Sequence, residues 1–102
     1  MMDLVRAFAD ELAAGRGRAD ATVRSYAGDL ADLARFLAEQ GVERAEDVRP
    51  HHLSLYVHRL KADGRSEATV SRRLASARAF FAFLQHRGVV ADNPAVRVER
   101  PR

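Results

Sequence analysis

Apolar side chains recur along this chain at the three- and four-residue spacing of amphipathic helices, in four separate blocks. The first block predicts a helix over Met2–Ala14, which Gly15 and the glycine that follows it would end. The third block predicts a helix that begins at Pro50, because proline suits the first helical position, and that ends at Gly64. The second and fourth blocks predict the two longest helices.

The second and fourth blocks are two copies of one pattern, offset by 47 residues. When residues 18–41 are laid on residues 65–88, an Ala-Thr-Val run coincides near the start and a Phe-Leu pair coincides near the end. Gly41 and Gly88 stop the two copies at the same relative position, where a helix commonly takes a glycine. The chain therefore contains a pair of similar long helices.

Capping signals fix the starts of these helices. Asp20 can accept hydrogen bonds from the first-turn amides of the second helix, and Ser66 can do the same for the fourth. Before the third helix, Val48 and Leu53 have the spacing of a hydrophobic staple.

Four helices with short connections predict an all-α fold, a four-helix bundle. A length of 102 residues corresponds to one domain, which we expect to cover residues 1–90. Residues 91–102 contain an Asn93-Pro94 turn and no helical stripe, although residues 96–98 fit a short extended segment. We expect this tail to start a linker towards a domain that the sequence does not contain.

The amino-acid composition limits the class of protein and the compartment in which it is expected. A hydrophobic fraction of 47% is that of a globular protein rather than a disordered one. The sequence has no cysteine, which excludes a disulfide framework and a thiolate metal site and fits a reducing compartment. The longest apolar run, Ala79–Leu84, is far short of the roughly 20 residues that span a bilayer. The N-terminus lacks the pattern of a signal peptide, so we expect a cytoplasmic protein without a membrane partner.

Charge is divided unevenly between the two halves of the chain. Residues 1–48 hold 6 Arg and 10 acidic residues, whereas residues 49–102 hold 11 basic and 4 acidic ones. Of the 17 basic residues, all but Lys61 are arginine, which suits bidentate contacts with phosphate and guanine. A basic second half favours a polyanionic partner, although high-GC coding also produces chains rich in alanine and arginine.

Catalytic patterns are weak. The histidines of the third helix have no carboxylate or thiol beside them to complete a metal site, so we interpret them as exposed. Asp29 and Asp32 form a carboxylate pair that we interpret as part of a solvated helix face. Tyr26 and Tyr56 fall among inward positions, where core packing is expected. The sequence has no glycine-rich phosphate loop, and no metal or nucleotide cofactor is implied.

The basic positions form a stronger pattern. The 47-residue offset sets Arg24 and Ser25 opposite Ser71 and Arg72. If the two long helices pack as a crossed pair, their first turns lie on one surface, and helix N-termini favour phosphate. Three further arginines flank these termini: Arg16, Arg18 and Arg65. This pattern favours DNA; the alternative is that the arginines only keep a bundle soluble.

Three motifs resemble a known family. The pattern T-V-x-x-Y-x-x-D-L at Thr22–Leu30 and the pattern S-x-x-T-V-x-R-R-L-x-x-x-R-x-F-F-x-F-L at Ser66–Leu84 resemble the second and fourth helices of one domain. This is the N-terminal core-binding domain of tyrosine recombinases, the Xer and phage-integrase group. The ending D-N-P-A-x-x-V-x-x-P-R at Asp92–Arg102 is similar to the segment that leads into their catalytic domain. Ala19 departs from the family, which usually has a capping serine there; Asp20 would take that role.

The resemblance implies a SAM-like four-helix domain that forms one half of a C-shaped clamp around double-stranded DNA. In that family the second and fourth helices cross and face the major groove. Carried onto this chain, it implies DNA contacts from Arg24, Ser25, Thr69, Ser71, Arg72 and Arg73, with Arg65 and Arg78 on phosphates.

The resemblance also implies partners and a division of labour. Other recombinase protomers would contact the first helix through Leu4, Val5 and Phe8, while the isolated domain would be monomeric. Strand cleavage in the family belongs to a C-terminal domain with a nucleophilic tyrosine, so we expect this segment not to be an enzyme. Chromosome-dimer resolution and integration of phage or mobile elements both stay open. Two rival functions are a stand-alone helical DNA-binding regulator and a protein-interaction bundle.

Overall fold

The computed structural model describes residues 1–15 and 20–98, and within them it contains helices and no strand. The elements are α1 (Met2–Gly15), α2 (Asp20–Glu39), the short 3-10 helix η1 (Ala45–Asp47), α3 (Pro50–Ala62) and α4 (Glu67–His86). The predicted all-α class with four helices is confirmed. The glycine–arginine connector between α1 and α2 and the last four residues of the tail lie outside the described residues. Among the described helices, none is both long and apolar enough to cross a membrane.

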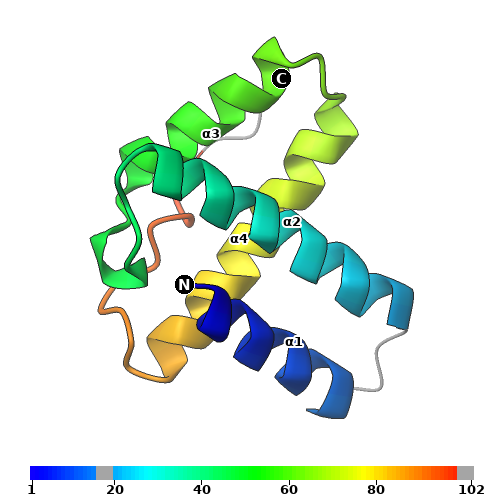
Figure 1. Cartoon of the computed structure of the whole chain (residues 1–102), viewed down its shortest axis with the longest axis vertical. Coiled ribbons are helices and arrows are strands. Elements are labelled where there is room, and N and C mark those ends of the chain that lie inside the picture. Colours follow the sequence, from blue (N-terminus) through cyan, green and yellow to red (C-terminus); the bar gives the residue numbers. More distant parts are fainter. Residues whose placement is uncertain (16–19, 99–102) are drawn as a thin grey trace.

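The two helices of the repeat cross each other. Figure 1 shows α2 passing over α4 near the middle of both, with α1 beside α2 and running in the opposite direction. α3 packs against α4 and α2 at the other end of the molecule. This arrangement agrees with the SAM-like bundle that the resemblance implied, in which the second and fourth helices form the crossed pair.

Two of the predicted caps account for ends of the long helices, whereas Asp20, the predicted cap of α2, is the first residue of that helix. Ser66 Oγ accepts a hydrogen bond from the Thr69 amide at 3.1 Å, so α4 starts where its cap predicts. At the end of α2, Gly41 has a φ of 80°, and the Val42 amide donates to the Leu37 carbonyl at 2.8 Å. This is a Schellman closure, which favours glycine because the left-handed backbone strains other residues.

The start of α3 contains a contact that the sequence did not predict. Pro50 occupies the first turn as expected, and Val48 and Leu53 are both buried, as a staple requires. His52, expected to be exposed, is partly buried, and its Nδ1 accepts a hydrogen bond from the Arg49 amide at 2.9 Å. The histidine therefore does the work that glutamate or glutamine does in a capping box.

Aromatic side chains join α1 to α4 in the core. The Phe8 ring lies 5.8 Å from that of Phe80 and 5.3 Å from that of Phe83, measured between centroids. Val5 and Phe8 are only 2% and 4% exposed, so the expectation that they contact another protomer is wrong for both. Their side chains are used inside this chain, whereas Leu4 keeps part of its surface.

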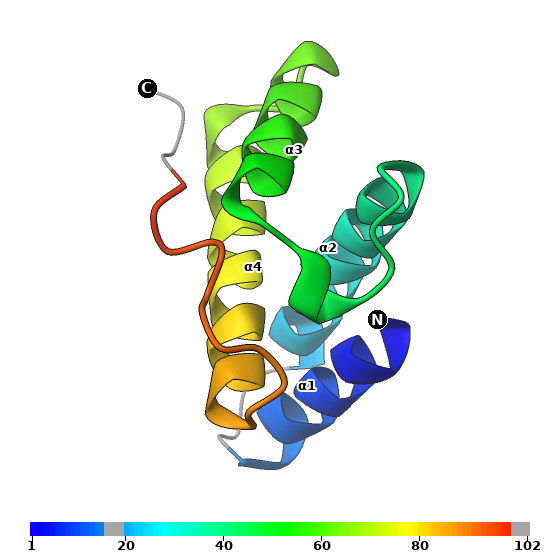
Figure 2. The same cartoon turned by 90° about the vertical axis from the view of Figure 1, so that its left-hand side faces the viewer.

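The tail packs against α4 instead of leaving the bundle. It turns back after α4 and runs alongside it (Figure 2), with Ala95 and Val98 buried in the core. Residues 94–97 form a turn, so the predicted extended segment at residues 96–98 is wrong. The reason is local, because Asn93 Oδ1 accepts a hydrogen bond from the Ala95 amide at 3.0 Å and closes the turn. The packed unit thus reaches Val98, while the boundary expected at residue 90 stays a prediction.

Candidate nucleic-acid interface

The crossing of α2 and α4 is built on equivalent positions of the repeat. Ser76 Oγ lies 3.2 Å from Asp29 Oδ2, and these two residues are separated by 47 positions, the offset of the two copies. Ser76 is fully buried and Asp29 is 6% exposed. The single hydroxyl proton of Ser76 has a second acceptor in the Arg72 carbonyl at 3.1 Å. The two copies therefore meet at the same point of their shared pattern.

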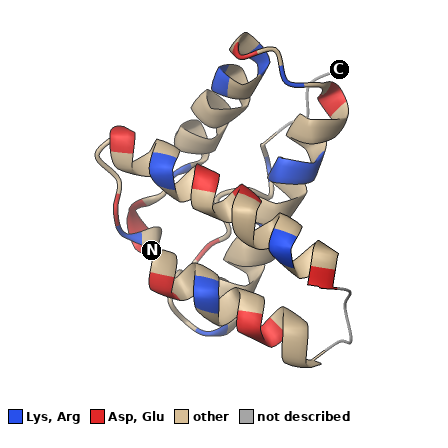
Figure 3. Ribbon diagram, turned by 45° about the vertical axis from the view of Figure 1, so that its right-hand side comes forward, with Lys and Arg blue, Asp and Glu red and all other residues tan. Residues whose placement is uncertain are grey.

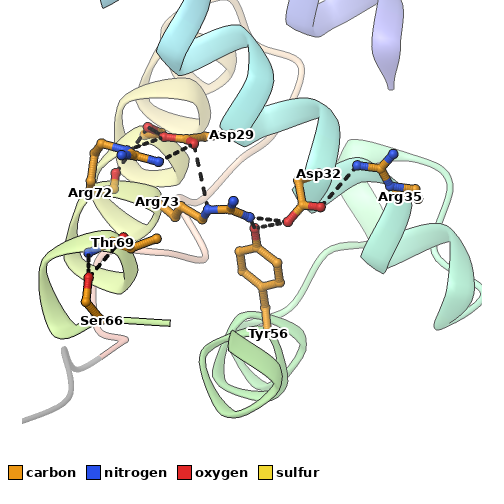
Figure 4. A network of polar contacts seen from close by, with 9 residues as sticks. Asp29, Asp32, Arg35, Tyr56, Ser66, Thr69, Arg72 and Arg73 are labelled. Atoms are coloured by element: carbon orange, nitrogen blue, oxygen red, sulfur yellow. Dashed lines mark hydrogen bonds and ion pairs between the residues drawn. The ribbon is translucent and has the colours of Figure 1, made fainter. Parts of the chain in front are cut away.

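Arg72 makes a bidentate contact across this crossing. Its Nε donates to Asp29 Oδ2 and its Nη2 donates to Asp29 Oδ1, each at 3.0 Å (Figure 4). The hydrogen bonds to Asp29 and the charge of that carboxylate raise the pKa of Arg72 above its ordinary value. About half of the Arg72 side chain, 49%, nevertheless stays exposed, compared with 6% for Asp29. The guanidinium thus lies between a buried carboxylate and solvent.

Arg73 lies deeper and joins three helices. Its Nη1 bonds to Asp32 of α2 and lies 3.2 Å from the hydroxyl of Tyr56 in α3, and its side chain is 14% exposed. Tyr56 donates to Asp32 Oδ2 at 2.8 Å, so the three groups form a closed triangle (Figure 4). Burial is the main reason why the pKa of Tyr56 lies above its ordinary value. Burial also raises the pKa of Asp32, but hydrogen bonds from Tyr56 and Arg35 outweigh it, and the net direction is downward.

The interpretation of Asp29 and Asp32 as a solvated face is wrong. The two carboxylates lie on the side of α2 that packs against α4, where Arg72 and Arg73 meet them. The charge difference between the two halves of the chain is therefore partly neutralised inside the fold. A signal was present in the sequence, because the 47-residue offset aligns Asp29 with the small Ser76 and so predicts a close crossing there.

The remaining predicted residues near the crossing are more open. At the start of α4, Arg65 is exposed and Thr69 is half-buried, its Oγ1 3.0 Å from the capping Ser66 hydroxyl. On α2, Arg24 is exposed and Ser25 is half-buried. Arg16 and Arg18, expected beside the start of α2, lie outside the described residues.

Ser71 and Arg78 lie on a different side of α4 from Arg72. Seven residues separate them, close to two turns, so they share one face, while Arg72 is rotated by about 100° from Ser71. The Arg78 guanidinium donates to the Ala95 carbonyl at 3.1 Å and to the Val98 carbonyl at 2.8 Å. The predicted residues therefore divide into a group at the crossing and a second face of α4, on which Arg78 contacts the tail.

Charges of both signs are interspersed along the first two helices. Figure 3 shows acidic and basic segments alternating along α1 and α2 rather than a ribbon of one sign. Binding of a polyanion by this surface would thus depend on a few arginine side chains and their geometry more than on net charge.

Known proteins resemble this chain over nearly all of its length. It is 38% identical over 98 residues to tyrosine recombinase XerD of Agrobacterium fabrum, covering 96% of this chain and 29% of that protein. It is 34% identical over 99 residues to tyrosine recombinase XerC of Listeria monocytogenes, covering 97% of this chain and 33% of that protein.

The chain spans about a third of the length of the curated relatives it matches. No solved structure gives a significant match. The family model described as phage integrase, N-terminal SAM-like domain, matches residues 5–88. These residues include α3 and nearly all of α1, together with the crossed pair α2 and α4. The chain therefore belongs to the family of phage integrase N-terminal SAM-like domains.

Proposed function

We propose that this chain is the DNA-binding domain of a site-specific tyrosine recombinase, and that it grips duplex DNA through α2 and α4 during recombination or integration. Family membership and the names of the relatives support the recombinase part. The observation that carries the DNA part is Arg72, a guanidinium fixed at the α2–α4 crossing with half of its side chain open to solvent.

The proposed contact surface, called here the crossing surface, consists of residues on both helices and at the start of α4. It comprises Arg24, Ser25, Arg65, Thr69 and Arg72. Arg73 stands behind it as a support, because its guanidinium is mostly buried among Asp32 and Tyr56. Ser71 and Arg78 lie on another face of α4, where Arg78 binds the tail, and would meet DNA only if the duplex extends over that side.

We assign strand cleavage to a part of the parent recombinase outside this chain. Tyr56 is buried, and its hydroxyl donates a hydrogen bond to Asp32. Burial raises the pKa of Tyr56, which makes it a poor nucleophile. Tyr26 stacks on Phe8, with 6.5 Å between the ring centroids, as a packing residue does. The role of this segment would be to hold the duplex in place while another domain acts on it.

A salt titration of duplex binding tests the proposal. Three exposed arginines that each meet a phosphate predict a slope of about −2.7 in a log–log plot of affinity against salt. We expect a dissociation constant on the order of 10⁻⁴ to 10⁻⁶ M for a mixed-sequence duplex, measured by fluorescence anisotropy. If the chain does not bind the duplex at low salt, the proposal is wrong and a protein-interaction bundle becomes the better reading.

A further inference from the structure

The geometry points to Asp29 as a positioning residue for DNA, which holds the Arg72 guanidinium so that its outer edge faces the ligand. This inference rests on the proposed function. It assigns a favourable role in DNA binding to a buried acid, although an acid near DNA is expected to oppose binding.

The contact between the two side chains leaves one edge of the guanidinium open. A guanidinium is planar and carries five N–H donors in fixed directions. Asp29 takes the edge formed by Nε and Nη2, each at 3.0 Å. Nη1 and the second hydrogen of Nη2 form the adjacent edge at the end of the guanidinium, and within the described residues Nη1 has no hydrogen-bond partner. Because the Arg72 side chain is 49% exposed, this outer edge can reach a ligand.

The Asp29 carboxylate is itself held in place, so it can act as a fixed support. Its Oδ2 is 3.2 Å from the buried Ser76 hydroxyl, and its Oδ1 is 3.8 Å from Arg73 Nε. That Nε is buried and has no hydrogen-bond partner among the described residues, so the Asp29 carboxylate is its compensating charge. An arginine whose conformation is fixed before binding loses less side-chain freedom on binding than a flexible one.

The outer edge matches a ligand with two adjacent acceptors. In duplex DNA these are either two oxygens of a phosphate or the O6 and N7 atoms of guanine, both of which arginine binds with two parallel hydrogen bonds. Exposed Arg24 and Arg65 supply further positive charge on the same surface. A paired-acceptor group of duplex DNA is therefore the ligand that we assign to Arg72.

Charge alone and positioning predict opposite signs for one substitution. Asp29→Asn removes a negative charge beside the DNA, so simple electrostatics predicts tighter binding. If Asp29 positions Arg72, the same change leaves the guanidinium free to move and weakens DNA binding by about five- to tenfold. This is the loss expected for one good bidentate contact. The matched control is Asp20→Asn, which removes the same charge from an exposed position on the same helix and should bind as wild type or tighter.

The experiment measures anisotropy of a labelled mixed-sequence duplex of about 30 base pairs, long enough to span two to three helical turns, at low salt. It compares wild type, Asp29→Asn, Arg72→Ala and the double variant. In the Arg72→Ala background we expect Asp29→Asn to have no effect or to tighten binding, which a general structural defect would not produce. If wild type binds the duplex and Asp29→Asn binds it equally well or more tightly, this inference alone is overturned. If wild type does not bind, the proposed function is overturned as well.

Circular dichroism establishes that each variant is folded. If Asp29→Asn does not fold, Arg72→Lys supplies the test, because lysine keeps the charge and cannot make the bidentate contact. We expect it to bind like Arg72→Ala, and wild-type affinity would overturn the inference. Repeating the Arg72→Ala comparison on a duplex with 7-deazaguanine separates the two acceptors. If the difference in affinity between wild type and Arg72→Ala disappears on this duplex, the acceptor is the guanine edge. If the difference persists, the acceptor is a phosphate.

Discussion

α2 and α4 share a sequence pattern but have opposite charges at their contact. Both helices are 20 residues long, each is followed two residues after its end by a glycine with positive φ, and they cross at the equivalent positions Asp29 and Ser76. At that crossing α2 supplies carboxylates and α4 supplies guanidiniums. The repeat thus determines where the helices meet, and the residues that differ between the copies determine what the meeting point can do.

The differences in charge lie within about two turns of each helix, at residues 25–32 and 72–79. Arg72 and Arg73 of α4 stand at the positions that Ser25 and Tyr26 occupy in α2. Since only one copy carries the arginines, the acids of the other copy can pair with them without repulsion between like charges. Arg72 is anchored in this way and keeps about half of its side chain exposed, whereas its equivalent Ser25 is half-buried and carries no charge.

The largest expected effect tests whether the shared part of the repeat contributes equally in both copies. Leu37 and Leu84 are equivalent residues, and both are 0% exposed. We expect Leu37→Ala and Leu84→Ala each to lower the free energy of unfolding by about 2–5 kcal/mol, through lost burial and a new cavity. Urea denaturation followed by circular dichroism measures this. A cost below about 1 kcal/mol for only one of them would show that the two copies are not equivalent in the core.

A smaller effect tests the part in which the copies differ. Asp32→Asn removes a carboxylate that accepts from Tyr56 and pairs with Arg73; its equivalent in α4 is Ala79. A hydrogen bond to a charged group is worth up to about 3 kcal/mol, and we expect about 1 kcal/mol because 34% of the Asp32 side chain is exposed.

The pH dependence of that loss follows from the lowered pKa of Asp32. A carboxyl whose pKa is lower in the folded state stabilises the fold above its unfolded pKa of about 3.9, and this contribution is lost as pH falls through the folded pKa. In urea unfolding, the difference in stability between Asp32→Asn and wild type should therefore be smaller at about pH 3 than at pH 7. Asp20→Asn is the charge-matched control, and an equal loss at both pH values would contradict the explanation.

Periodicity and capping residues were enough to predict the helices. The apolar stripes predicted all four, and Pro50, Ser66 and the glycines at 41 and 88 predicted where helices start or stop. These signals are local, since each depends on hydrogen bonds within a few residues of the cap. The Asn93-Pro94 turn was predicted, but its continuation through residue 97 was missed, because Val96 and Val98 suggest a strand.

The candidate site was predicted less well, because its contacts between α2 and α4 join residues more than 40 positions apart. Nothing within the first half of the chain indicates that Asp29 is buried; that follows only from Arg72 and Ser76 on the opposing helix. The resemblance implied that Arg78 contacts a phosphate, and in the fold it binds backbone carbonyls of a tail whose path the sequence did not predict. Residue type predicted what each group can bind, but only the packing determines which partner it meets.

An effect of about 1 kcal/mol tests whether the arginine present in one copy alone contributes to DNA affinity. Arg72→Ala should weaken duplex binding by about fivefold or more, since it removes a bidentate contact from the crossing surface. Arg35→Ala removes the same charge from an exposed position on α2 and should change affinity by less than about twofold. Anisotropy titrations at one salt concentration compare them. A larger loss for Arg35→Ala would place the DNA surface on the outer side of α2.

The smallest effect concerns α3, which lies outside the repeat and has a histidine, His52, in its first turn that accepts a hydrogen bond from the backbone amide of Arg49. Burial, together with the neighbouring His51, lowers the pKa of His52, and its Nδ1 must be unprotonated to accept from the Arg49 amide. A histidine with a lowered folded pKa binds fewer protons in the native state, so stability is complete above the unfolded pKa of about 6.5 and falls as pH drops through the folded pKa.

We expect wild type to lose about 0.5–1 kcal/mol between pH 7.5 and pH 5, the range of a helix cap. His52→Gln keeps an acceptor at the same position without titrating, so it should remove this part of the pH dependence in urea unfolding, while Ser66→Ala at the α4 cap should shift stability equally at both pH values. If His52→Gln keeps the full wild-type dependence, another group is titrating. The comparison would then show that α3, like α4, has a start that does not respond to pH.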